Sequence, residues 1–391
     1  MTPEPLPNLG IGKRLAFSLL PAILLLAALE IVLRVTGAAK ECDGAFTKSA
    51  LWACDPILDF KTRTTLKIGG KPVDADGFRG PPLDPAARYT VMAMGDSTTF
   101  GEITSSTEHP GMFISEPYPE RLQTIAVNRN GPGALSVFNA GQCGYNSYHG
   151  LLLLKTKLRS LRPNIVTVKY GWNDLLYSNE PPGSYREPSS AVVREVQDFL
   201  LLTAIYPFGK KLAKDFQGAR QSEAAAALKL PTPRDDWTPN VPLLDFDHNL
   251  RRIVEIARGR GAVVWLLTSG DAFMTDDFRG REEAYDHVAS QQGMTIALGG
   301  IKSFRQLEEL HARYNDTIRT VGADLGVPVV DIAERVYRRR AAEHLFTSFD
   351  AIHPNETGHS LEAEALYLQL KNAGIVGPGT RWGVGGRPTQ R

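Results

Sequence analysis

The chain has 391 residues, of which 42% are hydrophobic and 22% charged, and its 44 basic and 43 acidic side chains give a net charge of +1. This composition excludes a disordered protein, a collagen, a disulfide-scaffold miniprotein and a strongly basic nucleic-acid binder, so no nucleic-acid partner is expected. Three cysteines without a Cys-x-x-Cys pair argue against a structural zinc site. The length allows one large domain or two of medium size.

An apolar stretch lies close to the N-terminus, after a short segment of residues 1–14. Its 19 residues, Leu15–Leu33, would form a helix of about 28 Å, close to the hydrocarbon thickness of a bilayer. Pro21 would kink this helix, and Glu30 is costly in lipid unless it lies near the interface, where Arg34 one turn later can pair with it. Residues 15–33 are therefore predicted to form a single transmembrane anchor.

A cleaved signal peptide is the alternative for this stretch. Lys13 and Arg14 would be its basic region, and Thr36–Ala38 its small-residue cleavage site. We favour the anchor because a signal core usually has about 7–15 residues and carries no acidic side chain. Either interpretation predicts that the chain is exported from the cytoplasm.

The orientation of the anchor is inferred from the sizes of its flanks, because the basic residues on its two sides are balanced. Only 12 residues precede Lys13, whereas the large domain follows, so that domain is expected outside the cytoplasm, in the periplasm or at the cell surface. Cys42 and Cys54 could form a disulfide in such an oxidising compartment. The alternative is that they are two unrelated small core residues.

After a linker or lead-in of residues 38–89, short apolar runs alternate with amphipathic stretches. The apolar runs have the length of buried strands and are Thr90–Met94, Ser136–Ala140, Ile165–Tyr170, Ala262–Thr268 and Val327–Ile332. The stretches with helical periodicity include Tyr148–Leu161, Leu243–Arg258 and Phe304–Leu325. This alternation predicts one α/β domain, residues 90–376, whose parallel sheet is covered by helices on both faces.

Two segments interrupt the alternation and are interpreted as insertions. Residues 175–242 are rich in proline and contain a small Ala-rich helix at Glu223–Leu228, and residues 271–302 have mixed charge. Residues 377–391 are rich in Gly, Pro and Arg, which predicts a disordered tail.

A serine follows the first predicted strand, in the sequence Gly95-Asp96-Ser97. Ser97 would thus lie at the carboxyl end of a buried strand, where open α/β sheets bind their ligands. A turn from strand to helix exposes the hydroxyl there and lets backbone N–H groups face an anion. The alternative is an ordinary N-cap serine at the start of a helix.

A base and a group to orient it occur together near the end of the domain. Asp350 and His353 lie three positions apart, so within one turn the carboxylate can bond one imidazole nitrogen while the other nitrogen faces the serine. The alternative is a helix start, because aspartate and the following Pro354 both favour such boundaries.

Two further strand ends carry candidate oxyanion donors. Asn173 follows the third predicted strand and can donate through its side-chain amide, and Gly144 follows the second, where a glycine lets a backbone N–H approach a ligand closely. Turn chemistry alone would explain either residue. We infer an active site because the nucleophile, both donors and the base all fall at the same edge of one sheet in a usable chain order.

These residues resemble the blocks of the SGNH hydrolases, also called the GDSL esterase family. The blocks are matched by Gly95-Asp96-Ser97, Gly144, Gly171-x-Asn173-Asp174 and Asp350-x-x-His353, and the resemblance covers roughly Thr90–Leu370. A Gly77-Phe78-Arg79-Gly80 stretch is similar to membrane-anchored bacterial members. Gly144 is preferred to Gly141 as the second-block glycine from its distance after Asn139.

The resemblance implies a flavodoxin-like three-layer sandwich with a five-stranded parallel sheet, and esterase, lipase or deacetylase chemistry without a metal or cofactor. In that chemistry Ser97 attacks the acyl carbonyl, His353 is the base and Asp350 orients it. The backbone N–H groups of Ser97 and Gly144 and the amide of Asn173 form the oxyanion hole. Thr98 stands where the family usually has leucine, which does not touch the chemistry.

The expected function is that of an extracytoplasmic serine esterase acting on an O-acyl ester of an envelope glycan or a lipid. The alternatives are a glycan O-acyltransferase that uses the same acyl-enzyme, and an inactive SGNH fold that only binds glycan. Cys143 is interpreted as a small buried residue rather than a nucleophile. His359 is interpreted as part of the first turn of the final helix rather than a metal ligand.

Overall fold

The computed structural model describes residues 11–40, 51–103, 112–176, 185–213, 239–272, 304–339, 344–347 and 352–377. The chain forms two compact units. Unit 1 combines Met1–Gly44 with Cys54–Asp59 and Ser189–Ala227, and unit 2 holds the remaining residues, including the predicted domain apart from part of its first insertion.

The core of unit 2 is a five-stranded sheet, whose strands are β5 (Thr90–Gly95), β6 (Ser136–Gly141), β7 (Ile165–Lys169), β8 (Val263–Leu267) and β9 (Val329–Val330). All of its neighbouring strands run parallel, in the order β6-β5-β7-β8-β9. Numbered along the chain this is the 2-1-3-4-5 order of flavodoxin-like sheets, whose switch point lies between β5 and β7. The predicted fold class is confirmed.

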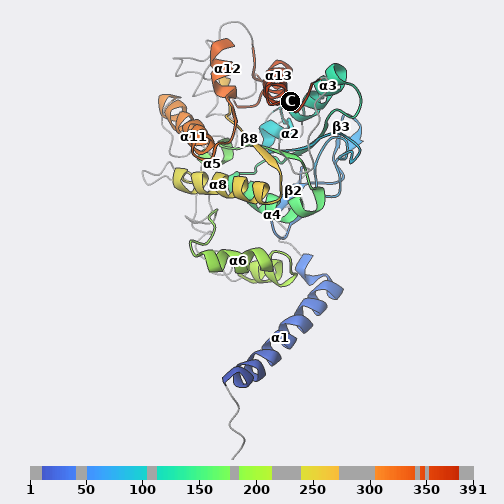
Figure 1. Ribbon diagram of the computed structural model, residues 1–391, viewed down its shortest axis with the longest axis vertical. Coiled ribbons are helices and arrows are strands. Elements are labelled where there is room, and N and C mark those ends of the chain that lie inside the picture. Colours follow the sequence, from blue (N-terminus) through green and yellow to red (C-terminus); the bar gives the residue numbers. More distant parts are fainter. Residues whose placement is uncertain are drawn as a thin grey trace, which may run out of the picture. The chain divides into compact units, whose positions relative to one another are not determined.

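Helices cover both faces of this sheet (Figure 1). On one face α3 (Tyr118–Asn130), α12 (Ile332–Arg339) and α13 (Glu356–Asn372) share a core cluster with alternate strand residues such as Val91, Ala93 and Val137. On the other lie α4 (Ser147–Leu161), α8 (Leu243–Gly259) and α11 (Phe304–Leu325). The strands are buried along almost their whole length, as expected of a parallel sheet with two covered faces.

The predicted strands and helices agree with the structure within a few residues, except for the last strand. The run Val327–Ile332 is predicted as six residues, yet β9 has only two, Val329–Val330. Pro328 precedes it, has no N–H to donate and accepts from Leu266 through its carbonyl, and Ile332 already begins α12. The edge strand is therefore limited to two residues, by the proline before it and by the start of α12 after it.

The segment predicted as a linker contains regular structure. Residues 51–89 carry four short strands, β1 (Trp52–Asp55), β2 (Asp59–Thr62), β3 (Lys67–Ile68) and β4 (Lys71–Pro72), paired as β1-β2 and β3-β4. Phe78 and Arg79 are buried, and Gln142 accepts from the backbone N–H and hydroxyl of Thr62 while its amide donates to the carbonyl of Gly77. Strands this short leave no alternation in the sequence, which is why the prediction overlooked them.

Unit 1 contains the long N-terminal helix α1 (Ile11–Thr36), which includes the predicted anchor. An 18-residue stretch of it, Leu19–Thr36, is long and apolar enough to cross a membrane, a test that a signal sequence also passes. Arg34 donates through Nε to Glu30 at 2.6 Å, as the sequence predicts.

The predicted insertion of residues 175–242 contains two helices that the sequence analysis did not identify, α6 (Ala191–Leu200) and residues 205–213. The predicted Glu223–Leu228 helix, most of the second insertion and the tail after residue 377 lie outside the described residues. Cys54 is disulfide-bonded, but Cys42 lies outside them too, so the pairing of these two residues stays a prediction.

Candidate active site

Three strand ends form one level edge of the sheet. Gly95, the last residue of β5, lies opposite Gly141 of β6 on one side and Lys169 of β7 on the other. Because all three strands are parallel, the residues that follow them emerge together at the carboxyl edge. Ser97, Gly144 and Asn173 come two, three and four residues after these ends, respectively.

Ser97 begins the short helix α2 (Ser97–Phe100) directly after β5. Asp96 is the N-cap, and its carboxylate accepts from the backbone N–H of Thr98 at 2.9 Å and from its hydroxyl at 2.7 Å. A side chain at Gly95 would place Cβ 2.0 Å from Oγ1 of Thr99 and 2.7 Å from the carbonyl oxygen of Lys169, so only glycine permits this tight turn. Asp96, which has no role in the sequence-based prediction, thus starts the helix that holds Ser97.

His353 lies against Ser97. Its Nε2 is 2.8 Å from Oγ of Ser97, and both side chains are buried. The structure therefore brings together two of the three predicted triad residues, which are 256 positions apart. Asp350 lies outside the described residues, so its predicted contact with His353 stays a prediction.

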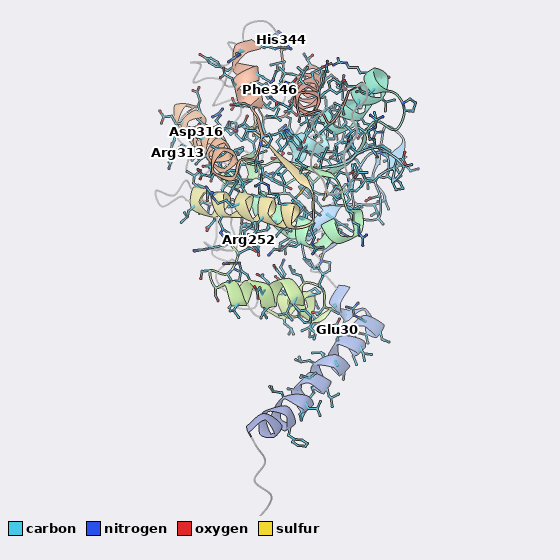
Figure 2. The ribbon with its side chains drawn as sticks, viewed as in Figure 1. Glu30, Arg252, Arg313, Asp316, His344 and Phe346 are labelled. Atoms are coloured by element: carbon cyan, nitrogen blue, oxygen red, sulfur yellow. The ribbon has the colours of Figure 1, made fainter. Side chains whose placement is uncertain are left out.

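The backbone around His353 is held by a small antiparallel bridge. Thr347 donates its N–H to the carbonyl of His353 at 2.9 Å, and Phe346 pairs with Pro354. Figure 2 labels His344 and Phe346, whose carbonyls both accept from the side-chain amide of Asn355. Asn355, not Asp350, is the N-cap of α13, because its side chain accepts from the N–H groups of residues 357 and 358.

Gly144 adopts a left-handed backbone conformation, with φ of +85°. A Cβ there would also lie 3.2 Å from the ring of Phe60, so both the conformation and the space favour glycine. Gly141 has its backbone N–H engaged by the side chain of Asn139 at 3.0 Å. That bond makes Gly141 a poor donor to a ligand, and it supports the choice of Gly144 as the second-block glycine.

Asn173 lies in α5 (Trp172–Leu175), and its side-chain amide donates to the carbonyl of Tyr145 at 3.0 Å. The neighbouring Asp174 accepts from the backbone N–H of Ser147 at 2.9 and 3.2 Å. These bonds tie the turn after β7 to the loop that carries Gly144. Asn240 donates to the carbonyl of Asn173 at 2.9 Å and holds the turn from the other side.

Burial raises the pKa of Asp174 from 3.8 to about 7, and the hydrogen bonds from Ser147 offset only part of this effect. An acid whose pKa is higher in the folded than in the unfolded chain keeps its proton in the folded state, while the unfolded chain releases it from about pH 4. The free energy of unfolding should therefore fall as pH rises from about 4 to about 7, and this contribution should be constant above that range.

Asp174→Asn is expected to weaken this pH dependence, because asparagine keeps an acceptor for the N–H of Ser147 but has no proton to lose. The measurement is chemical unfolding of the detergent-solubilised chain at several pH values, with Asp245→Asn as the control at a partly exposed aspartate. If the free energy of unfolding changes with pH equally steeply in Asp174→Asn and in wild type, a group other than Asp174 causes the pH dependence.

A buried ion pair lies beneath the nucleophile turn. Nζ of Lys169, the last residue of β7, bonds Glu362 of α13 and lies 5.2 Å from the ring centroid of Tyr118. Burial raises the pKa of Glu362, an effect that the nearby Lys169 cation partly offsets. The ion pair joins the last residue of β7, which lies opposite Gly95 at the end of β5, to α13.

His359 and Cys143 both agree with their structural interpretations. His359 lies in the first turn of α13, fully buried, and its Nδ1 accepts from the backbone N–H of Tyr118 at 3.2 Å. Burial lowers its pKa well below the usual value, so it is neutral. Cys143 packs in a buried cluster with Leu51, Val73 and Phe100, and burial raises the pKa of its thiol.

Arg79, in the Gly-Phe-Arg-Gly stretch, is the main residue near the site whose role the sequence analysis missed. Its side chain is 4% exposed, and its guanidinium pairs with Glu120 at 2.8 Å and donates to the carbonyls of Phe100 and Ile114 at 2.9 and 3.0 Å. It thereby fixes the C-terminal end of α2, the helix that begins with Ser97. The signal available in the sequence was an arginine in a short stretch bounded by Gly77 and Gly80.

Arg79→Met is expected to lower the free energy of unfolding by about 3–5 kcal/mol, because it leaves Glu120 without its partner and two buried carbonyls without donors. The matched control is Arg129→Met, which removes an exposed arginine–glutamate pair with Glu364 and should cost at most about 1 kcal/mol. Equal shifts of the denaturant midpoint in the two variants would contradict this role for Arg79.

A second missed contact lies behind Asn173. Its neighbour Trp172 stacks on His311 with ring centroids 4.1 Å apart, and Nδ1 of His311 lies 2.6 Å from the carboxylate of Asp271. Asp271 follows β8 and so lies at the same edge of the sheet. Its position after a predicted strand was a usable signal, whereas nothing in the sequence points to His311.

The site has two parts. One is a serine hydroxyl in hydrogen-bond contact with an imidazole, and the other is the turn after β7, which Asn173 and Asp174 join to the loop that carries Gly144. A serine so placed can be activated by proton transfer to the imidazole, which is the requirement for nucleophilic catalysis. Among the residues that the structure describes, no group of three His, Cys, Asp or Glu side chains could hold a metal ion.

Comparison with known proteins gives a family match and several distant structures. The model of the GDSL-like Lipase/Acylhydrolase family matches residues 93–361. A lipase/acylhydrolase from Enterococcus faecalis is 15% identical, with a TM-score of 0.43, and the match covers 75% of this chain and 100% of that one.

Two further solved structures are similar at the same level. A catalytic mutant of an acetylxylan esterase from Geobacillus stearothermophilus has 14% identity and a TM-score of 0.40, covering 73% of this chain and 95% of that one. A GDSL-like lipase from Bacteroides thetaiotaomicron has 14% identity and a TM-score of 0.37, covering 73% and 89%. The comparison with curated proteins finds no match.

The family match spans more than half of the chain and includes every one of the predicted site residues. It starts within β5 and ends within α13, so it coincides with the sheet and the site described above. The chain belongs to the GDSL-like lipase/acylhydrolase family.

Proposed function

We propose that the protein is a serine esterase in which Ser97 is the nucleophile and His353 the general base. The observation that carries this proposal is the 2.8 Å separation between Oγ of Ser97 and Nε2 of His353 at the carboxyl edge of the sheet. An imidazole at this distance can accept the hydroxyl proton as the oxygen attacks an acyl carbon. Asp350 is assigned, from its spacing, to orient His353.

The reaction has two halves. Oγ of Ser97 forms a bond to the acyl carbon while its proton moves to His353, and the resulting oxyanion accepts from the backbone N–H groups of Ser97 and Gly144 and from the amide of Asn173. His353 then gives the proton to the leaving alcohol. Water, deprotonated by the same imidazole, releases the acyl group and restores the serine.

A serine-directed fluorophosphonate tests the nucleophile directly. The full chain in detergent should gain one adduct, and peptide mapping should place it on Ser97. Ser360→Ala, which removes a hydroxyl that only donates to the carbonyl of Glu356 on α13, should label like wild type. An adduct on another serine, or no adduct with folded protein, would overturn the assignment.

The proposed substrate is an O-acyl ester of an envelope glycan or a lipid, because a membrane-anchored esterase meets both. Hydrolysis rates for short-chain and long-chain acyl esters would separate the two classes. Product analysis with an added glycan acceptor would distinguish hydrolysis from transfer of the acyl group to a sugar hydroxyl, since both reactions pass through the same acyl-enzyme.

The proposed location is outside the cytoplasm, with α1 as a single-pass anchor. In a bacterial expression host, protease added to spheroplasts should degrade the catalytic domain, whereas inverted membrane vesicles should protect it. This result is expected because the large domain follows the anchor in the chain and is proposed to be exported. Protection in spheroplasts and cleavage in inverted vesicles would reverse the assigned orientation.

A further inference from the structure

Helix α6 (Ala191–Leu200) exposes one continuous apolar face. Val192, Val193, Val196 and Phe199 are 70%, 50%, 52% and 67% exposed. Their spacing of one, three and four residues places them on the same side of a helix. Exposed apolar faces of this kind mark contacts with a partner or a membrane.

Three of the four polar side chains of α6 are more covered than its exposed apolar ones, and the fourth, Glu195, is exposed. Arg194, Gln197 and Asp198 are each half-buried. Arg194 donates to the carbonyl of Ser189 at 2.7 Å, and the amide of Gln197 donates to the hydroxyl of Tyr206 at 3.1 Å. A helix on the surface of a soluble domain normally exposes its polar side and buries its apolar side, so the exposed apolar face of α6 points to a partner or a membrane.

The segment that carries α6 is bonded to α1. The carboxylate of Glu30 accepts from the backbone N–H groups of Ala204, at 2.9 Å, and Ile205, at 3.2 Å. Arg34 donates to Glu30 and to the carbonyl of Leu202. Figure 2 labels Glu30 on α1 where these bonds join it to the start of the helix of residues 205–213.

This junction lies at a definite depth along α1. Glu30 precedes the last helical residue, Thr36, by six residues, which corresponds to about 9 Å along the helix axis. Helices that lie in a membrane interface are buried by about 5–10 Å. The bonds of Glu30 therefore hold the α6 segment at the level of an interface when α1 crosses a bilayer.

Unit 1 exposes further apolar side chains on α1 and after α6. Leu24, Leu25 and Leu26 of α1 are 60%, 72% and 53% exposed, and Leu202, two residues after the end of α6, is 47% exposed. The charged residues of α6 are Arg194, Glu195 and Asp198, so the helix has no excess of basic charge for binding anionic headgroups. Any attraction to a membrane would be hydrophobic.

We propose that α6 is an interfacial membrane helix, lying on the phospholipid bilayer that α1 crosses, with Val192, Val193, Val196 and Phe199 among the acyl chains. This inference rests on α1 being the anchor of the proposed function. The protein then has two contacts with one bilayer, a crossing helix and a surface helix, which together restrict the tilt and rotation of unit 1.

A photoreactive diazirine amino acid tests the placement in the full chain, reconstituted in phosphatidylcholine vesicles. It replaces Val193 on the apolar face or, as the control, Asp198, which lies on the polar side of the helix, about 140° away from Val193 around its axis. A third position, Leu25, reports on α1. After illumination, mass spectrometry identifies what each probe has bonded.

The expected result is a phospholipid adduct at positions 193 and 25, with a yield several-fold higher at 193 than at 198. Because the bilayer is zwitterionic and the contact hydrophobic, added salt should leave the yield at 193 unchanged. Val193 and Leu25 are exposed and Asp198 is half-buried, so none of the probes disturbs a packed core.

Other outcomes overturn the inference in distinguishable ways. Lipid adducts at 25 with none at 193, or a bond from 193 to a second copy or to another part of the same chain, would leave α1 as the anchor and reject α6 as a membrane helix. Lipid adducts at neither position would reject both. Hydrolysis of a soluble ester, measured on the same preparation, tests the proposed esterase activity independently of the membrane contacts.

Discussion

Ser97→Ala is expected to lower kcat for ester hydrolysis by about 10⁴–10⁶-fold, because the bond between the acyl carbon and Oγ can no longer form. The fold should persist, since the loss is one hydroxyl and α2 is capped by Asp96 rather than by the serine. The measurement is kcat with a soluble chromogenic ester, together with the thermal unfolding temperature of the same preparation.

His353→Ala provides the matching test, because a nucleophile and its base act as one unit. We expect the single variants to lose similar activity and the Ser97→Ala/His353→Ala double variant to lose no more than either. The backbone at His353 keeps its bond from Thr347, which preserves the local bridge. Losses that add in the double variant would show that the two residues do not work on the same step.

Asn173→Ala is expected to lower kcat by about 10²–10³-fold with little change in KM. If the amide donates to the oxyanion, it binds the transition state more strongly than the substrate, and losing one such donor costs about 2.7–4 kcal/mol. The amide nitrogen carries two N–H groups, and the bond to Tyr145 uses one of them. The second is the one assigned to the oxyanion.

The structure also gives Asn173 a positioning contact, so the test needs a control for the shape of the turn. Asn240→Ala removes the bond to the carbonyl of Asn173 and leaves its side chain in place. A large fall in kcat for Asn173→Ala and a small one for Asn240→Ala would support oxyanion donation. Equal falls, or a stable Asn173→Ala variant with unchanged kcat, would remove Asn173 from the mechanism.

The sequence by itself determined the order and most bounds of the central elements. Five apolar runs and the helices between them are local patterns, and their alternation implies parallel strands whose carboxyl ends share an edge. For this reason Ser97 and His353 could be expected close together although 256 positions separate them. The pairing of Glu30 with Arg34 was equally predictable, because residues four apart on a helix are neighbours.

The tertiary structure alone decided which residues support the site. Arg79 reaches α2 and Glu120, Lys169 reaches Glu362, and both contacts join positions far apart in the chain, so they leave no local periodicity. The short strands before β5 and the two-residue β9 are defined by their partners rather than by an apolar run.

The orientation of α6 has the same origin. The sequence of α6 determines that the helix has an apolar face and a polar face. It does not determine which of the two is covered, because burial depends on elements elsewhere in the chain. In the folded protein the polar side packs toward Ser189 and Tyr206 while Val192 and Phe199 stay exposed. Local spacing thus determined the elements and the candidate chemistry, whereas long-range packing decided which residues support them and which face of α6 stays exposed.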